Sequence, residues 1–291
     1  MKIKHINLEQ ICQLDCIYCR RNTYVKNGYR TKSFQSIVSE LDTLCRENPD
    51  LEEISIRGGG EPTLLPGFID FCRILNERGL RFSLETDGIA LSDSSYLREL
   101  IDLGLTCVIL NFNSYYPKIY DEITNTTGFY PRIIETLRNL ETHSVVTTLN
   151  IVILRQNVDH FYKIPFFLKQ KFPRLNIRSL TISLVRINSP ARDFVKGSFR
   201  YSDHAAMISQ NILNLERYFV IELGTGAGSF PYCIFPEITA RKEGFGAQGK
   251  EDDRMHVFID SCGKCDYRKN CPGISSTYVE IYGSDEFKPI K

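Results

Sequence analysis

Residues 11–19 read ICQLDCIYC and directly follow an apolar, strand-like run at Ile3–Leu8. Cys12, Cys16 and Cys19 have the spacing C-x3-C-x2-C. One interpretation is that three thiolates hold three irons of a four-iron cluster and leave the fourth iron open. The other is that positions i, i+4 and i+7 line one face of a helix, where the cysteines are core residues. This stretch favours the cluster, and later parts of the chain bear on the choice.

Outward from this stretch, strand-like and helix-like segments alternate to about residue 187. The strand-like runs lie at Ile3–Leu8, Glu53–Arg57, Arg81–Thr86, Thr106–Asn111, Val145–Leu154 and Arg178–Arg186. Six strands alternating with helices predict an α/β fold whose parallel sheet has helical crossovers. The regular order, without a Gly-rich phosphate turn after the first strand, favours a partial (β/α)6 TIM-type barrel over a doubly wound sheet. In such a barrel the chemistry belongs at the C-terminal ends of the strands.

The pattern changes after this barrel, and we predict three domains. Residues 1–187 form the partial barrel, and residues 188–219 are a linker with a loop at Asn188–Arg200 and a helix at Asp203–Phe219. Residues 220–291 form a small domain rich in Gly, Pro and Cys. Such a domain buries too little apolar surface to hold itself together, and a bound metal centre would supply the missing stabilisation.

A second group of cysteines lies in this small domain. CGKCDYRKNC gives Cys262, Cys265 and Cys271 the spacing C-x2-C-x5-C, and Cys233 lies upstream as the natural fourth thiolate. Four sulfurs fit a fully ligated [4Fe-4S] cluster or a tetrahedral zinc ion, and the spacing does not separate the two. The remaining cysteines stand alone and are expected to be small core residues: Cys45, Cys72 and Cys107.

Composition narrows the class of protein. The chain carries 36 basic and 35 acidic residues, which argues against a general nucleic-acid or anionic-membrane binder, because such proteins need surplus positive charge. The N-terminus has no apolar run typical of a signal peptide, and no stretch approaches the length of a membrane span. We therefore expect a cytoplasmic protein, in which clustered cysteines bind metal or do redox chemistry.

Two glycine-containing motifs follow the next predicted strands. Residues 57–62 read RGGGEP, and residues 84–88 read LETDG. The triple glycine lets the backbone approach a ligand closely, and Glu61 could accept a hydrogen bond from an ammonium group. The alternative is a tight strand-to-helix turn without a ligand.

Together, these motifs resemble the radical S-adenosylmethionine (SAM) family, whose signature is C-x3-C-x2-C after the first barrel strand and Gly-Gly-Glu after the second. The resemblance implies that Cys12, Cys16 and Cys19 hold the SAM-binding [4Fe-4S] cluster. It also implies a set of cofactor-binding residues: Tyr18 near the adenine, Gly59, Gly60 and Glu61 at the methionine amino group, Thr86 and Asp87 near the ribose, and Asn111 on the following strand. Asp87 and Asn111 depart from the usual Asn and Ser of the family.

The C-terminal cysteines resemble the SPASM and twitch extensions of this family, which carry auxiliary iron–sulfur clusters. A full SPASM extension needs more cysteines, and no cysteine follows Cys271. The resemblance therefore implies a twitch-like domain with one auxiliary [4Fe-4S] cluster.

By the same resemblance, the expected activity is reductive cleavage of SAM to a 5′-deoxyadenosyl radical that abstracts hydrogen from a substrate. Relatives with such extensions indicate oxidative modification or cross-linking of a peptide or protein. The alternatives are a small-molecule dehydrogenase or epimerase, and a non-catalytic, metal-stapled binding or electron-transfer protein. An electron donor such as flavodoxin or ferredoxin is an expected partner. Because only about ten residues precede Cys12, leader recognition is expected to need a separate peptide-recognition protein or another surface.

Overall fold

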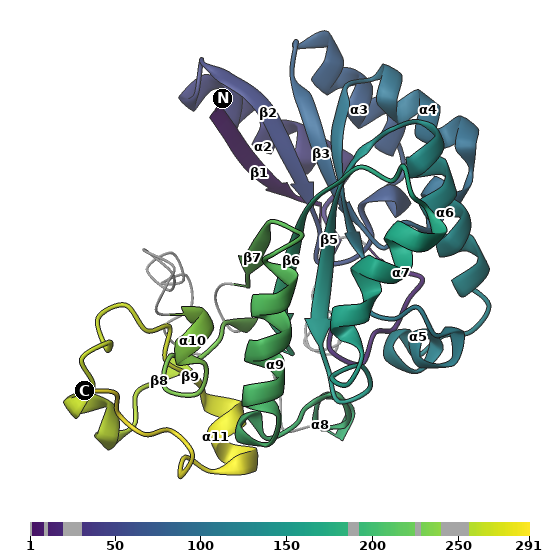
Figure 1. Ribbon diagram of the computed structural model, residues 1–291. Helices are drawn as coiled ribbons and strands as arrows, with labels where there is room; N and C mark the ends of the chain where they lie inside the picture. Colours follow the sequence, from purple (N-terminus) through teal and green to yellow (C-terminus); the bar gives the residue numbers. More distant parts are fainter. Residues whose placement is uncertain (1, 9–10, 20–30, 186–191, 225–227, 240–255) are drawn as a thin grey trace. The chain divides into compact units, whose positions relative to one another are not determined.

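The computed structural model describes residues 2–8, 11–19, 31–185, 192–224, 228–239 and 256–291 (Figure 1). Within these ranges seven strands form one sheet in the order of the sequence, from β1 to β7. The strands are β1 (Lys2–Asn7), β2 (Leu51–Arg57), β3 (Arg81–Thr86), β4 (Leu105–Asn111), β5 (Val146–Ile153), β6 (Ile177–Leu184) and β7 (Ile221–Leu223). The pairs β1–β2, β2–β3, β3–β4 and β6–β7 are parallel.

Helices connect the strands, as parallel pairing requires. They are α2 (Phe34–Glu47), α3 (Phe68–Glu77), α4 (Ser94–Asp102), α5 (Pro117–Thr124), α6 (Tyr130–Thr142), α7 (Ile164–Lys171), α8 (Arg192–Gly197), α9 (Tyr201–Leu215), α10 (Pro236–Thr239) and α11 (Ser276–Tyr282). Short 3-10 turns occur at Pro62–Leu64, Ile89–Ser92, Phe161–Lys163 and Asp260–Lys264. Sequential parallel strands with helical crossovers confirm the predicted α/β barrel connectivity. No helix within the described ranges is both long and apolar enough to cross a bilayer.

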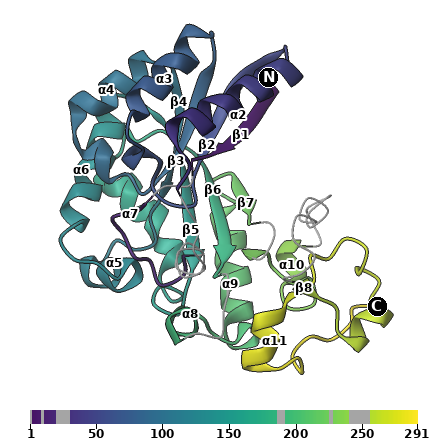
Figure 2. The same ribbon diagram turned by 180° about the vertical axis from the view of Figure 1, so that it is seen from behind.

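The chain folds as two compact units, and the first comprises Met1–Leu149 and Pro165–Arg178. Helices α3, α4 and α6 lie along one face of its strands (Figures 1 and 2). Its helix starts carry local signals: the Ser33 hydroxyl accepts from Ser36 N at the start of α2, and the Asp93 carboxylate accepts from Ser95 N at the start of α4. The core between sheet and helices consists of fully buried aliphatic and aromatic side chains, among them Ile54, Ile56, Phe71, Leu84, Leu97, Val108 and Leu137.

The second unit comprises Asn150–Ile164 and Ser179–Lys291. Besides β7 and α9 it contains a two-stranded antiparallel sheet of β8 (His256–Val257) and β9 (Ile274–Ser275). The fully buried Tyr278 of α11 stacks on Tyr201 of α9, with ring centroids 4.1 Å apart. Tyr201 N donates to the Tyr278 hydroxyl oxygen at 2.8 Å, and Arg200 pairs with Asp285 at 2.6 Å. These contacts fasten the C-terminal segment to the start of α9.

All six expected strands are present, and the structure adds the three-residue strand β7 within the segment that we assigned to the Cys-rich domain. The expected loop at Asn188–Arg200 is wrong in part, because α8 forms within it. Gly197 is the last residue of this helix, a position near the helix end where glycine is tolerated. The predicted domain boundary at residues 187 and 188 lies outside the described residues, so the three-domain division remains a prediction.

Candidate functional site

The first cysteine group lies on the loop that follows β1. Residues 11–19 form no helix, so the helix-face interpretation of the spacing is wrong. Two backbone hydrogen bonds hold the loop against the end of α5, from Asp15 N to Thr124 O and from Ile17 N to Ile123 O, both 3.0 Å. Cys12, Cys16 and Cys19 are each half-buried and unbridged.

The charges around these sulfurs test whether the residues fit an iron–sulfur cluster. The pKa of Cys12 is raised to about 12, mainly by burial, with smaller contributions from the charges of Asp87, Glu61 and Cys19. Burial, followed by the charges of Cys19 and Cys12, raises the pKa of Cys16 well above its ordinary value. The three sulfurs therefore lie close enough to repel one another as thiolates. Iron ions would supply the missing positive charge, and the donor set fits the group.

Glu61 ties the ends of β2 and β3 together. Its carboxylate is buried, with 1% of the residue exposed. Its Oε1 accepts from Thr63 N at 3.1 Å, from Thr63 Oγ1 at 2.7 Å and from Thr86 Oγ1 at 2.7 Å, while Oε2 accepts from Asp87 N at 2.8 Å. A carboxylate has about four acceptor positions, two on each oxygen. Three of these donors share Oε1, and one donates to Oε2.

Asp87 connects this network to the cysteine loop. Its Oδ1 accepts from Gln13 Nε2 at 3.1 Å and from Ile89 N at 2.9 Å. Its Oδ2 lies 3.8 Å from the sulfur of Cys12. Burial and the nearby Glu61 charge raise the pKa of Asp87. The structure thus brings together the two predicted motifs and Cys12, and Gln13 is a contact that the sequence analysis missed.

Tyr18 is anchored by a second residue that we did not predict. Asn113 Nδ2 donates to the Tyr18 hydroxyl oxygen at 2.9 Å, which leaves the hydroxyl proton available for the Cys16 sulfur, its other partner. The predicted Asn111 is the last residue of β4 and is half-buried, whereas Asn113 is buried beyond the strand end. The signal in the sequence was the repeated asparagine of LNFNS, of which we chose the first.

The glycine turn after β2 leaves little room for side chains. A Cβ atom on Gly58 would lie 2.8 Å from Gly60 O. The backbone of this turn reaches the cysteine loop, because Glu61 N donates to Ile11 O at 2.9 Å. Gly59 and Gly60 therefore lie on the turn between the cysteine loop and Glu61, where the sequence analysis expected a ligand.

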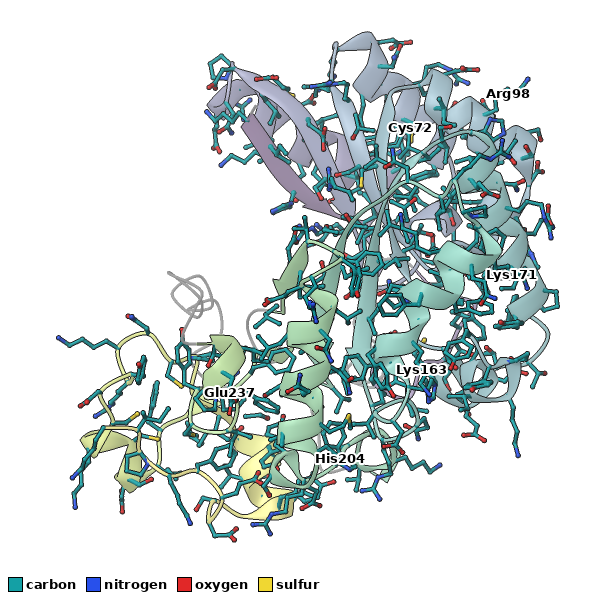
Figure 3. All side chains as sticks on the ribbon, viewed as in Figure 1. Cys72, Arg98, Lys163, Lys171, His204 and Glu237 are labelled. Atoms are coloured by element: carbon teal, nitrogen blue, oxygen red, sulfur yellow. The ribbon has the colours of Figure 1, made fainter. Side chains whose placement is uncertain are left out.

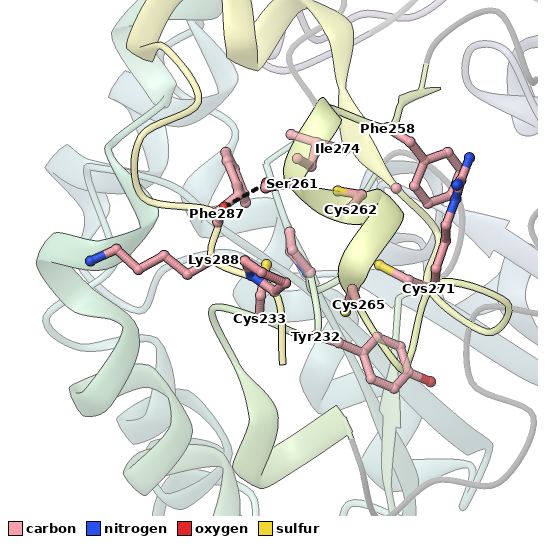
Figure 4. Close-up of a pocket in the computed structure, with 14 residues that line it drawn as sticks. Tyr232, Cys233, Phe258, Ser261, Cys262, Cys265, Cys271, Ile274, Phe287 and Lys288 are labelled. Carbon is pink, nitrogen blue, oxygen red and sulfur yellow. Dashed lines mark hydrogen bonds between the residues drawn. The ribbon is translucent and has the colours of Figure 1, made fainter. Parts of the chain in front are cut away.

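The second cysteine group lines a hollow in the other unit. Cys233, Cys262, Cys265 and Cys271 surround a space of about 390 Å³, part of it open to solvent, together with apolar side chains such as Phe258, Ile274 and Phe287 (Figure 4). The pKa of Cys233 is raised to about 12, mainly by burial, with smaller contributions from the charges of Cys271, Cys262 and Cys265. All four predicted cysteines therefore meet at one place.

The isolated cysteines lie elsewhere. Cys72 on α3 (Figure 3) is buried as expected. Cys107 on β4 is also buried, whereas Cys45 on α2 is only half-buried. Among the described residues, no three His, Cys, Asp or Glu side chains are arranged closely enough to hold one single metal ion.

Comparison with known proteins defines the class. The profile of the Radical SAM superfamily matches residues 6–168, more than half of the chain, and the protein belongs to this superfamily. SAM and a [4Fe-4S] cluster are therefore its cofactors.

Individual relatives cover parts of the chain. Over 153 residues it is 27% identical to the 7,8-dihydro-6-hydroxymethylpterin dimethyltransferase of Methanocaldococcus jannaschii, a match covering 52% of this chain and 30% of that protein. Over 151 residues it is 25% identical to the PqqA peptide cyclase of Rhizobium meliloti, covering 50% and 38%. The chain thus spans less than half the length of these curated relatives. SAM-bound SuiB of Streptococcus suis shares the fold, with a TM-score of 0.62 and 13% identity over 99% of this chain and 76% of SuiB.

Proposed function

We propose that this radical SAM enzyme holds its SAM-binding cluster through Cys12, Cys16 and Cys19 and oxidatively modifies or cross-links a peptide or protein. The observation that carries the proposal is the half-buried cysteine loop beside the Glu61–Thr86–Asp87 network. When bound there, the cluster would supply the electron that breaks a carbon–sulfur bond of SAM and yields the 5′-deoxyadenosyl radical.

The protein's own part is to bind SAM and keep it in place. In this proposal Glu61 Oε2 takes the SAM ammonium group, and the hydrogen bonds from Thr63 and Thr86 hold Oε1 in position. The Asn113–Tyr18 hydrogen bond fixes the tyrosine ring beside Cys16, at the expected adenine position. Positioning of this kind is what radical chemistry requires, because a misplaced radical attacks the protein itself.

We further propose that Cys233, Cys262, Cys265 and Cys271 hold one auxiliary [4Fe-4S] cluster. Two observations support four thiolates around one centre: the shared hollow, and the pKa values of Cys233 and Cys271, which are raised by burial and, to a smaller extent, by the charges of neighbouring cysteines. Such a centre could take an electron from a substrate radical, which would make the net reaction an oxidation. Zinc is the alternative occupant, although in the described residues the four cysteines do not lie close enough together to hold one single ion. Metal analysis of the purified chain distinguishes the two.

The peptide substrate is supported by the relationship to the PqqA peptide cyclase. A small-molecule substrate is the second candidate, and the relationship to the pterin dimethyltransferase favours it. In either case we expect flavodoxin or ferredoxin as the electron donor. For a peptide, a separate recognition protein would present the substrate.

The test is formation of 5′-deoxyadenosine by the anaerobically reconstituted full chain with dithionite and SAM. We expect product from the wild type and from Cys45→Ser, whose cysteine is isolated on α2, and none from Cys12→Ser, Cys16→Ser or Cys19→Ser. An iron-loaded wild type that forms no 5′-deoxyadenosine would favour the non-catalytic electron-transfer alternative and contradict the proposal.

A further inference from the structure

Two oppositely charged side chains lie at the C-terminal ends of neighbouring strands, beside the Gly-Gly-Glu turn. Ile56 of β2 pairs with Leu84 of β3 in the parallel register, so Arg57 and Glu85 lie one residue farther along. Both Ile56 and Leu84 are fully buried in the core. Because successive side chains of a strand point to opposite faces, Arg57 and Glu85 share the face opposite to Ile56 and Leu84. In a (β/α) barrel, ligands bind at this end of the strands.

The hydrogen-bonding capacity of these two side chains is largely unused. Arg57 is exposed, and its side chain makes one hydrogen bond within the described residues, from Nε to Ser55 Oγ at 3.3 Å. A guanidinium has five N–H donors, so both terminal nitrogens are available. Glu85 is half-buried, and its carboxylate accepts no hydrogen bond from the described part of the chain. A poorly solvated carboxylate without a donor is costly, and a ligand that supplies one is stabilised.

Arg57 and Glu85 influence each other without closing into an ion pair. Burial raises the pKa of Glu85, while the positive charge of Arg57 opposes this rise and the negative charge of Glu61 adds to it. Glu85 therefore lies within electrostatic reach of both Arg57 and the motif residue Glu61. A cationic and an anionic side chain thus lie on neighbouring strands, within electrostatic reach of each other.

We propose that Arg57 and Glu85 form a substrate subsite for a carboxylate with an N–H donor on the adjacent carbon. Arg57 binds the carboxylate through its terminal nitrogens, and Glu85 accepts the N–H. Two sources carry this chemistry, a free amino acid and the C-terminal residue of a peptide. The inference rests on the proposed function, because it gives that reaction a substrate group beside the SAM motif.

The experiment uses the anaerobically reconstituted full chain with SAM bound. Calorimetry measures the Kd of three probes for each common L-amino acid: the free amino acid, its N-acetyl derivative and its N-acetyl amide. We expect probes with a carboxylate to bind and amides to fail. Binding of free amino acids alone indicates a free amino-acid substrate, and binding of N-acetyl derivatives indicates a peptide C-terminus. Arg57→Gln and Glu85→Gln should each raise the probe Kd about ten- to hundredfold, as expected for a hydrogen bond to a charged group.

Glu52 and Arg81 provide the matched controls. They lie at the other ends of β2 and β3, both exposed, with charged atoms 3.9 Å apart. Glu52→Gln and Arg81→Gln should leave probe binding unchanged. The subsite is contradicted if no probe binds, if amides bind as well as carboxylates, or if Arg57→Gln and Glu85→Gln weaken SAM binding instead. A wild type that forms 5′-deoxyadenosine but binds no probe overturns the subsite alone, whereas one that forms none overturns the proposed function.

Discussion

Gly88 closes the Thr86–Asp87 motif, and its replacement by alanine tests the packing behind the site. Gly88 has a φ of +83°, and an added Cβ atom would lie 2.5 Å from Leu110 Cδ1 and 2.9 Å from Ile133 Cδ1. Both of these side chains are fully buried. A contact of 2.5 Å forces core atoms to move, so Gly88→Ala combines backbone strain with overpacking.

The two costs can be estimated separately. A left-handed backbone costs an L-residue about 1–2 kcal/mol, and an extra methyl group in a packed core costs about 1–3 kcal/mol. We therefore expect Gly88→Ala to lower the free energy of unfolding by about 2–5 kcal/mol. The displacement also reaches the site, because Gly88 N donates to Thr86 Oγ1 at 2.9 Å and Thr86 in turn donates to Glu61. We expect weaker SAM binding as well.

Gly79→Ala is the control. Gly79 has a φ of +70°, but no atom lies within 4 Å of an added Cβ, so only the strain of about 1–2 kcal/mol applies. Urea unfolding of both variants and calorimetric SAM binding provide the comparison. The reasoning is refuted if Gly88→Ala loses no more stability than Gly79→Ala and binds SAM like the wild type.

Three further predictions concern other parts of the molecule. Tyr18→Phe removes the hydroxyl proton available to Cys16. Because hydrogen bonds to the ligand sulfurs raise a cluster's potential, we expect a lower midpoint potential in a redox titration monitored by EPR. An unchanged midpoint potential would contradict a hydrogen bond from Tyr18 to the cluster ligand. Burial lowers the pKa of His160 below 6.5, so below about pH 6.5 the unfolded chain binds more protons than the folded chain, and the free energy of unfolding falls by at most about 1.4 kcal/mol per pH unit as the pH falls towards the folded pKa. We expect His160→Asn to reduce this pH dependence of the free energy of unfolding, measured by urea unfolding. An unchanged pH dependence would contradict the prediction. The double variant Cys262→Ser/Cys265→Ser should hold about four irons per chain, where the wild type holds about eight, as measured by iron and sulfide analysis. Loss of zinc instead of iron would show that the second site is a zinc site.

The sequence was sufficient for the sheet because its strands are buried and bounded by clear helical periodicity. Each of the six predicted strands overlaps an observed strand with ends within two residues. The misses are short elements. Strand β7 has three residues and α8 has six, which is less than two full periods of a strand or a helix, so the sequence shows no repeat that would indicate them. In the structure, β7 pairs with β6.

The candidate site was likewise predicted only in part. The spacing alone was enough to predict that Cys12, Cys16 and Cys19 lie close together, because residues so near in sequence lie on one loop. The hydrogen bonds of Gln13 to Asp87 and of Asn113 to Tyr18 span 74 and 95 positions in the sequence, and no local pattern predicts such partners. Arg57 and Glu85 escaped notice because their relationship depends on the register of two strands.

The most direct test uses the Cys262→Ser/Cys265→Ser chain, in which only the first site would hold iron. After anaerobic reconstitution and one-electron reduction, its EPR spectrum is recorded with and without SAM. We expect about four irons per chain, a spectrum that changes when SAM binds the open iron, and 5′-deoxyadenosine as the product. An iron-loaded chain whose spectrum ignores SAM, and which forms no 5′-deoxyadenosine, would contradict the assignment of Cys12, Cys16 and Cys19 as the ligands of a SAM-binding cluster.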